Sequence, residues 1–225
     1  MWWWSQRSSN PVGLDFQKNH KWFSKKTPLS ALKIISIDAE TSGFDQEQDR
    51  LLSIATVNVL ENEILINTMR SWVVFQANAD ANEATEVHGI LPSQTAEGDP
   101  ESLVLSELLP ELSGALIVGH HVGFDVGMIG AAVRRHFQFR FHTQFVDTGY
   151  IAMGQIDAFR QTGYANQQPP TLDELCVNLG VEMVDRHTAS GDAYTTAEVF
   201  LFFCARMRQR LGRPLLLGDL PLFRV

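Results

Sequence analysis

Apolar segments follow one another along the 225 residues in an order that strongly restricts the fold. The first three segments are short and rich in β-branched residues, and a polar turn at 61–63 separates two of them, which is typical of strands and a hairpin. Later segments alternate between strand-like runs and helical spacing. The expected strands are 32–38, 51–60, 64–75, 115–119 and 145–147, and the expected helices are 82–87, 102–112, 125–135, 148–153, 172–179 and 192–210. This order predicts an α/β fold with a mixed sheet, a β-meander followed by alternating helices and strands, and helices on both faces.

The composition is that of a globular protein, because hydrophobic residues make up 44% of the chain and charged residues 20%. The net charge of −8, from 18 basic and 26 acidic residues, argues against a surface that coats DNA broadly. It remains compatible with a nuclease whose metal ions neutralise acidic clusters. Cys176 and Cys204 stand far apart, which favours buried thiols and a reducing, cytoplasmic location. No apolar run approaches the roughly 18 residues of a transmembrane helix, so no membrane partner is expected.

Residues 1–30 differ from the rest of the chain and are expected to form an N-terminal extension to a compact domain at 31–225. The extension is rich in tryptophan and lysine and shows no clear strand or helix period. Two interpretations are open for its aromatic side chains. They pack on the domain, as tryptophan usually does, or they dock onto a partner.

Acidic residues stand at three boundaries between the predicted elements. Asp38 and Glu40 end the first strand two residues apart, so the period of a strand places both carboxylates on one face. Asp125 follows a buried strand across a glycine-containing turn, and Asp192 lies in the first turn of the last helix, for which Ser190 is the expected N-cap. Two carboxylates placed together repel each other unless a cation lies between them, so the pattern indicates a metal site.

Histidines accompany two of these acidic groups. His120 and His121 precede Asp125, and His187 precedes Asp192 by five residues. Each group alone has a structural explanation, such as an acidic residue that complements the helix dipole. The three groups occur in order, each beside a glycine-containing turn, and together they favour a shared catalytic role.

These three segments resemble the exonuclease motifs of the DnaQ-like DEDD 3′–5′ exonucleases, in the branch with a histidine in its third motif. This family is typified by the proofreading epsilon subunit of bacterial DNA polymerase III. Asp38 and Glu40 match the first motif, Asp125 the second, and His187 with Asp192 the third. The resemblance spans roughly residues 31–205 and implies a ribonuclease H-like fold. Further segments that resemble the family are 87–90, 146–148 and 172–176.

The resemblance also implies roles for these residues. Two divalent ions would lie in the site, and ligands that are all oxygen favour Mg²⁺ or Mn²⁺. Asp38 would contact both ions, Glu40 and Asp192 would complete the first site, and Asp125 would lie close to the second. His187 would be the general base, since an imidazole titrates near pH 6.5. A structural role for His187 is the alternative.

Seven residues are expected to contact the substrate by the same resemblance: Thr41, Gly43, Phe44, His88, Ile90, His121 and Phe124. Phe44 would stack on the terminal base, or it is an ordinary core aromatic residue. His88 likewise has core packing as its alternative. His121 stands where the family usually has asparagine, and Ser42 where it often has threonine, so substrate preference is open at these positions.

The sequence therefore predicts a metal-dependent 3′–5′ exonuclease that releases nucleoside monophosphates from single-stranded ends. DNA is the favoured substrate, in a proofreading or repair role, and a DNA polymerase subunit is a candidate partner. RNA 3′-end trimming, degradation of short RNA, and hydrolysis of nucleotides are alternatives. A catalytically idle scaffold that binds nucleic acid or a polymerase is the alternative of a different class.

Overall fold

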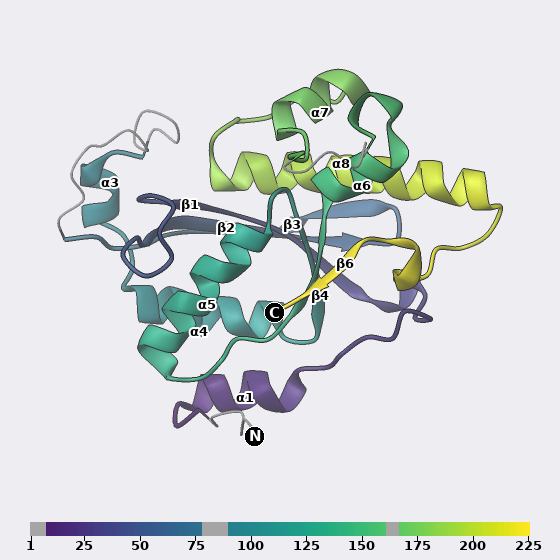
Figure 1. Cartoon of the computed structure of the whole chain (residues 1–225). Helices are drawn as coiled ribbons and strands as arrows, with labels where there is room; N and C mark the ends of the chain where they lie inside the picture. The colour runs from purple at the N-terminus through teal and green to yellow at the C-terminus, as the bar shows by residue number, and fades with distance from the viewer. Residues whose placement is uncertain (1–7, 78–89, 161–166) are drawn as a thin grey trace.

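A computed structural model describes residues 8–77, 90–160 and 167–225 (Figure 1). These residues form a six-stranded sheet with the strand order β3-β2-β1-β4-β5-β6. The strands are β1 (Lys33–Thr41), β2 (Leu51–Leu60), β3 (Glu63–Val73), β4 (Ala115–Gly119), β5 (Gln144–Asp147) and β6 (Leu222–Arg224). The predicted α/β class and the predicted meander of the first three strands are confirmed.

Strand direction changes in the middle of the sheet. β1, β2 and β3 pair antiparallel, whereas β4 pairs parallel to β1, and β5 pairs parallel to β4. β6 closes the far edge antiparallel to β5. Because β1, β4 and β5 run in the same direction, their carboxyl ends meet at one edge of the sheet. The last residues of β1, which include Asp38 and Glu40, thereby lie near the segments that follow β4 and β5.

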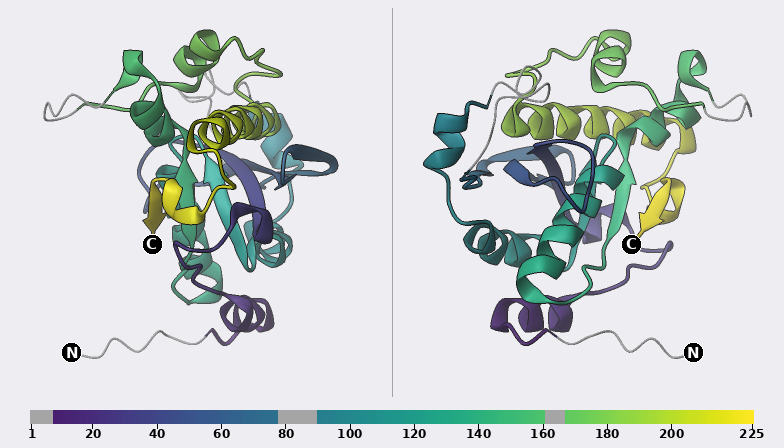
Figure 2. Two further views of the ribbon diagram at one scale, coloured as in Figure 1. Left: turned by 90° about the vertical axis from the view of Figure 1, so that its right-hand side faces the viewer. Right: turned by 60° about the vertical axis from the view of Figure 1, so that its left-hand side comes forward.

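Helices cover both faces of the sheet, as predicted (Figures 1 and 2). One apolar core lies between the sheet and a first set of helices: α1 (Pro11–Asn19), α4 (Glu101–Leu112) and α5 (Gly123–Phe137). The second core lies on the opposite face beneath α6 (Thr148–Gln155), α7 (Leu172–Leu179) and α8 (Ala189–Leu211). The short helix α3 (Pro92–Ala96) precedes α4. Among the described helices, none is long and apolar enough to cross a membrane.

Several elements depart from the sequence predictions, among them the short helix α3, which was not predicted. Helix α1 lies in the segment for which no period was expected, and its start carries clear signals: the Asn10 side chain accepts a hydrogen bond from the backbone of Val12, and Pro11 begins the helix. The N-cap of α8 is Thr188, whose hydroxyl accepts from the Gly191 amide, so the prediction of Ser190 is wrong. β6 was not predicted, because three residues become a strand only by pairing with β5. The helix expected at 82–87 lies outside the described residues.

The described part of the N-terminal segment packs on the sheet layer. Phe16 of α1 is 3% exposed and joins the core beneath α4 and α5. Its ring lies 5.3 Å from that of Phe141 and 6.0 Å from that of Phe139. Trp22 is 48% exposed and lies beneath the guanidinium of Arg224. Packing on the domain is therefore seen for Phe16, whereas Trp22 keeps an open face.

We expect Phe16→Ala to destabilise the protein by about 3 kcal/mol, because it empties a buried aromatic site. In a chain of this size each kcal/mol lowers the melting temperature by about 2–4 °C. Leu14→Ala, on the same helix but 43% exposed, is the matched control and should change the melting temperature little. Thermal unfolding followed by circular dichroism makes the comparison. Equal effects of the two substitutions would show that α1 does not depend on this contact.

Candidate active site

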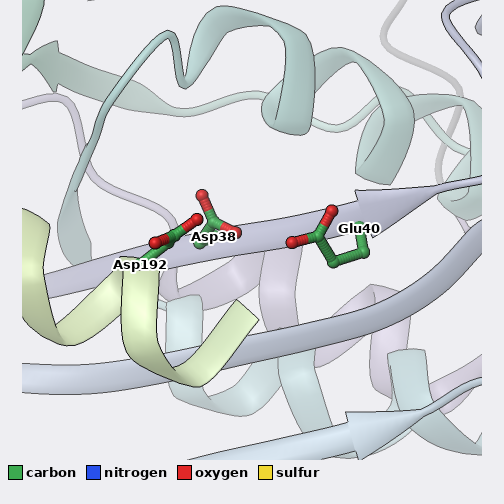
Figure 3. A group of neighbouring side chains, drawn as sticks. All are labelled: Asp38, Glu40 and Asp192. Carbon is green, nitrogen blue, oxygen red and sulfur yellow. The ribbon is translucent and has the colours of Figure 1, made fainter. Parts of the chain in front are cut away.

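Strand β1 carries two carboxylates on one face at its carboxyl end. Asp38 and Glu40 alternate with Ala39, so both side chains point to the α8 side, as the period-two pattern predicts. Asp192, from the first turn of α8, points into the same space (Figure 3). Each of the three residues offers a carboxylate oxygen within 4.8 Å of those of the other two. The predicted meeting of the first and third acidic segments is therefore present.

Asp125, from α5, lies beside these three carboxylates but outside the group whose oxygens are within 4.8 Å of one another. β4 pairs with β1 only as far as Ser36 and Val118, so the following residues of β1 face the start of α5. The Asp125 carboxylate is buried and accepts a hydrogen bond from the backbone N–H of Ala39, between the two acidic residues of β1. Its electrostatic interaction with Asp38 and Glu40 places it beside the cluster.

Burial and mutual repulsion dominate the electrostatics of these acids. Burial, then the charges of Asp125, Glu40 and Asp192, raise the pKa of Asp38 well above its ordinary value. Burial and the charge of Asp192 raise the pKa of Glu40 to about 7. Burial also raises the pKa values of Asp125 and Asp192. A divalent cation among the four carboxylates would favour their charged forms and reverse these shifts.

Arg186 supplies a positive charge at this centre that the sequence reasoning did not single out. Its guanidinium donates to Oδ2 of Asp192 and, on its other side, to Oδ1 of Asp173 at 2.5 Å. The two ion pairs hold the loop before α8 against the start of α7. The available signal was a lone arginine beside His187, six residues before an acidic residue of the cluster, but only the folded loop shows which carboxylates it meets.

The donor set fits a hard divalent cation. All candidate ligands are carboxylate oxygens, which suit Mg²⁺ and Mn²⁺. Within the described part of the chain, Oδ1 of Asp192 is buried and has no hydrogen-bond partner, while Oδ2 is held by Arg186. A buried acceptor without a donor is costly, and a bound cation would satisfy it. We therefore regard Asp38, Glu40 and Asp192 as candidate metal ligands, with Asp125 beside them.

His187 lies beside Asp192 of the acidic cluster. The residue is exposed, and its left-handed backbone (φ 65°) turns the chain into α8. Its charge interacts with the carboxylates of Asp192 and Asp173. The imidazole is therefore open to solvent beside a candidate metal ligand.

The loop after β1 is fixed by its own hydrogen bonds. The Thr41 hydroxyl donates to the Gly43 carbonyl at 2.8 Å, and a Cβ at Gly43 would clash with the Asp49 carboxylate. Phe44, at the tip of this loop, is 90% exposed and lies 5.7 Å from the ring of Phe124. The alternative that Phe44 is a core residue is wrong. An exposed ring beside the cluster is available to a base of the substrate.

The two histidines before α5 have different environments. The His120 ring bonds to Thr148 Oγ1 at 2.8 Å and to the Pro170 carbonyl at 2.9 Å, and burial lowers its pKa to about 3, so it is a neutral structural residue. His121 is exposed, and its ring stacks on that of His120 at 4.4 Å. Ile90 is half-buried before α3, and His88 lies outside the described residues.

Similarity to known proteins agrees with this geometry. The family model described as exonuclease, RNase_T, matches residues 35–200, and the chain therefore belongs to this exonuclease family, whose members include 3′–5′ exonucleases. The PolC-type DNA polymerase III of Thermotoga petrophila is 23% identical over 78% of this chain and 12% of its own length. The epsilon-like protein of Rhodobacter capsulatus is 26% identical over 82% of this chain and 25% of its own. The chain thus spans a quarter or less of these two relatives.

Solved structures share the fold. Escherichia coli exonuclease I bound to a dT13 oligonucleotide superposes with a TM-score of 0.63 at 19% identity, covering 80% of this chain and 42% of that one. Exonuclease X bound to 5′-overhanging duplex DNA gives a TM-score of 0.57 at 19% identity and covers 83% of this chain and 98% of that one. The predicted ribonuclease H-like architecture is confirmed by these neighbours.

We expect the stability of the protein in EDTA to depend on pH through Glu40. Its pKa is about 7 in the folded protein and 4.5 ordinarily, so between these values the folded state binds more protons than the unfolded state. The stabilisation is complete below the lower value and is lost as the pH rises through the higher one. Between about pH 5.5 and pH 8 the melting temperature of wild type should therefore fall by a few degrees more than that of Glu40→Gln.

Saturating Mg²⁺ is the control for this experiment. A bound cation favours the ionised carboxylates, so it should reduce the difference between wild type and variant. Identical pH profiles in EDTA would contradict the assignment of a raised pKa to Glu40.

Proposed function

We propose that this protein is a metal-dependent 3′–5′ exonuclease that releases nucleoside monophosphates from the ends of single-stranded DNA. The observation that carries the proposal is the meeting of Asp38, Glu40 and Asp192 within 4.8 Å, with Asp125 beside them and an exposed His187 at the mouth. An acidic cluster alone would suit a passive cation site. A histidine poised next to it adds a group that can accept a proton, which hydrolysis needs.

The four carboxylates would hold the divalent ions. Bound there, two such ions would lower the pKa of a water molecule and stabilise charge on the phosphoryl oxygens. Arg186 fixes the orientation of the Asp192 carboxylate. The His187 imidazole accepts the proton of the attacking water and releases it to solvent, which its exposure allows.

Single-stranded DNA is supported as the substrate by two kinds of similarity. Relatives include DNA polymerase III enzymes and an epsilon-like protein, and the structural neighbours include exonuclease I with oligonucleotides and exonuclease X with DNA. The exposed ring of Phe44 suits an unpaired base. A polymerase subunit is the partner that the relatives suggest. Hydrolysis of end-labelled DNA and RNA oligonucleotides of the same sequence, compared at equal concentration, separates this proposal from RNA trimming.

We expect hydrolysis to require a divalent cation and Asp38. Excess EDTA should stop the reaction, and Mg²⁺ or Mn²⁺ should restore it. Asp38→Asn should lower kcat by at least about 10³-fold, or about 4 kcal/mol of transition-state stabilisation, because it removes a charged ligand. Its melting temperature in EDTA should be unchanged or higher, since repulsion is relieved.

Glu63→Gln, at an exposed position in the β2–β3 hairpin, is the matched control and should keep full activity. Undiminished cleavage in excess EDTA would overturn the metal-dependent proposal, whereas loss of folding by Asp38→Asn would show a structural role.

We expect His187→Ala to lower kcat by about 10²–10⁴-fold, the usual contribution of a positioned general base. The acidic limb of the pH–rate profile should flatten, because that limb reports protonation of the imidazole. Metal affinity, measured by titration calorimetry, should change little. His136→Ala removes an exposed histidine at the far end of α5 and serves as the control. A near-normal kcat with the same acidic limb would remove His187 from the mechanism.

A further inference from the structure

A pocket of about 400 Å³ opens beside the acidic centre, at the carboxyl end of β5. Its walls come from the turn before α5, the start of α6, the segment before α7, and β6, which are far apart in the sequence. Three aromatic and three polar side chains dominate the lining: Phe145, Tyr150, Phe223, His121, Asp147 and Gln168. An aromatic pocket with a few converging polar groups is the usual form of a ligand site.

The aromatic wall is held rigid by ring contacts. Phe223 of β6 stacks on Phe145 of β5 at 5.4 Å with an interplanar angle of 17°. Tyr150 lies 4.9 Å from Phe223 and is 44% exposed, so its ring is supported on one side and open on the other. A ring already fixed in place loses little conformational entropy when a flat aromatic ligand stacks on it.

The polar wall contains one anchored and one exposed side chain. Asp147 is 3% exposed and caps α6, where its Oδ1 accepts from the Gly149 amide at 2.9 Å. The exposed amide of Gln168 supplies both a donor and an acceptor. A nucleobase has a flat aromatic face and carries donors and acceptors along its edge, so it matches both walls.

His121 connects the pocket to the acidic centre. Its ring lines the pocket and stacks on the clamped ring of His120, while the same turn leads directly to Asp125. Asp147 is also close enough to Asp125 for its charge to raise the pKa of that carboxyl. A ligand in the pocket would therefore lie next to the reacting phosphate.

The order of strands fixes which part of a substrate can reach the pocket. Phe44 lies in the loop between β1 and β2, the acidic cluster at the end of β1, and the pocket at the ends of β5 and β6. β5 is two strand spacings from β1, or roughly 10 Å. If the terminal nucleotide of the DNA lies on Phe44, the rest of the DNA chain would extend past the acidic cluster towards the pocket.

We propose that this pocket binds the base of the nucleotide on the 5′ side of the scissile phosphodiester, stacked on Tyr150. The inference rests on the proposed exonuclease function and specifies its substrate. The penultimate base must leave its stacked or paired position to enter the pocket, so the enzyme acts on ends in which at least two nucleotides are unpaired.

The test combines a protein variant with a substrate variant. Tyr150→Ala removes the stacking face, and Tyr150→Phe keeps it. DNA oligonucleotides carry an abasic residue at the last, the penultimate or the third position, and an unmodified oligonucleotide serves as reference. The first cleavage gives KM and kcat, and fluorescence anisotropy in EDTA gives Kd without turnover. Phe202→Ala, 40% exposed on α8 and distant from Asp192, is the matched control.

Tyr150→Ala should raise KM and Kd for the unmodified oligonucleotide about 5- to 150-fold, the range for loss of one stacked base, with kcat within about twofold. Tyr150→Phe and Phe202→Ala should bind as wild type does. On the oligonucleotide with the penultimate abasic residue, wild type and Tyr150→Ala should bind equally, because the stacking partner is already gone. Tyr150→Ala should still raise Kd when the abasic residue is at the last or the third position.

An equal penalty for Tyr150→Ala on the unmodified and the penultimate abasic oligonucleotide would overturn the proposal, and so would an absent penalty on the unmodified one. Failure of the exonuclease function gives a different result, in which wild type binds the oligonucleotides but does not shorten them. The Kd comparison then still decides whether the pocket holds a base.

Discussion

The parallel pairing of β1 with β4 is the constraint on which the site depends. The pairing of β1 with β4 stops at Ser36 and Val118. Asp38 and Glu40 lie beyond this pairing, in the part of β1 that faces the starts of α5 and α8. The freed backbone N–H of Ala39 is taken by Asp125, which ties the second acidic segment to the first. Continuing the ladder would occupy this backbone edge. The functional groups therefore lie where regular secondary structure ends, as is usual for parallel sheets.

Placing these carboxylates together opposes folding, since the charges of the other three raise the pKa of Asp38 and the charge of Asp192 raises the pKa of Glu40. The chain offsets part of this repulsion with backbone donors and with Arg186, while the two apolar cores on either side of the sheet supply the stability. Such a local cost to stability, together with strongly shifted pKa values, is the expected character of a functional site.

The acidic residues were predictable because their positions follow from local rules. A period of two places Asp38 and Glu40 together, and a turn followed by a helix places Asp125 and Asp192 at element starts. Arg186, Tyr150 and Phe223 could not be assigned in this way, since their partners come from segments that only the strand order brings together. The N-cap of α8 is Thr188, two residues before the predicted Ser190. Helix boundaries are uncertain by one or two residues when they are predicted from sequence.

The two carboxylate oxygens of Asp192 have different surroundings. Oδ2 is committed to a guanidinium that is itself anchored on Asp173, whereas Oδ1 faces inward without a donor among the described residues. A carboxylate held in this way would offer a divalent ion one oxygen, because turning Oδ2 towards the ion would break its ion pair with Arg186. Since Mg²⁺ prefers six oxygens and keeps several waters, attachment through one oxygen would leave coordination positions open to solvent and to a phosphate. Arg186 would thus limit how many oxygens Asp192 can give to an ion.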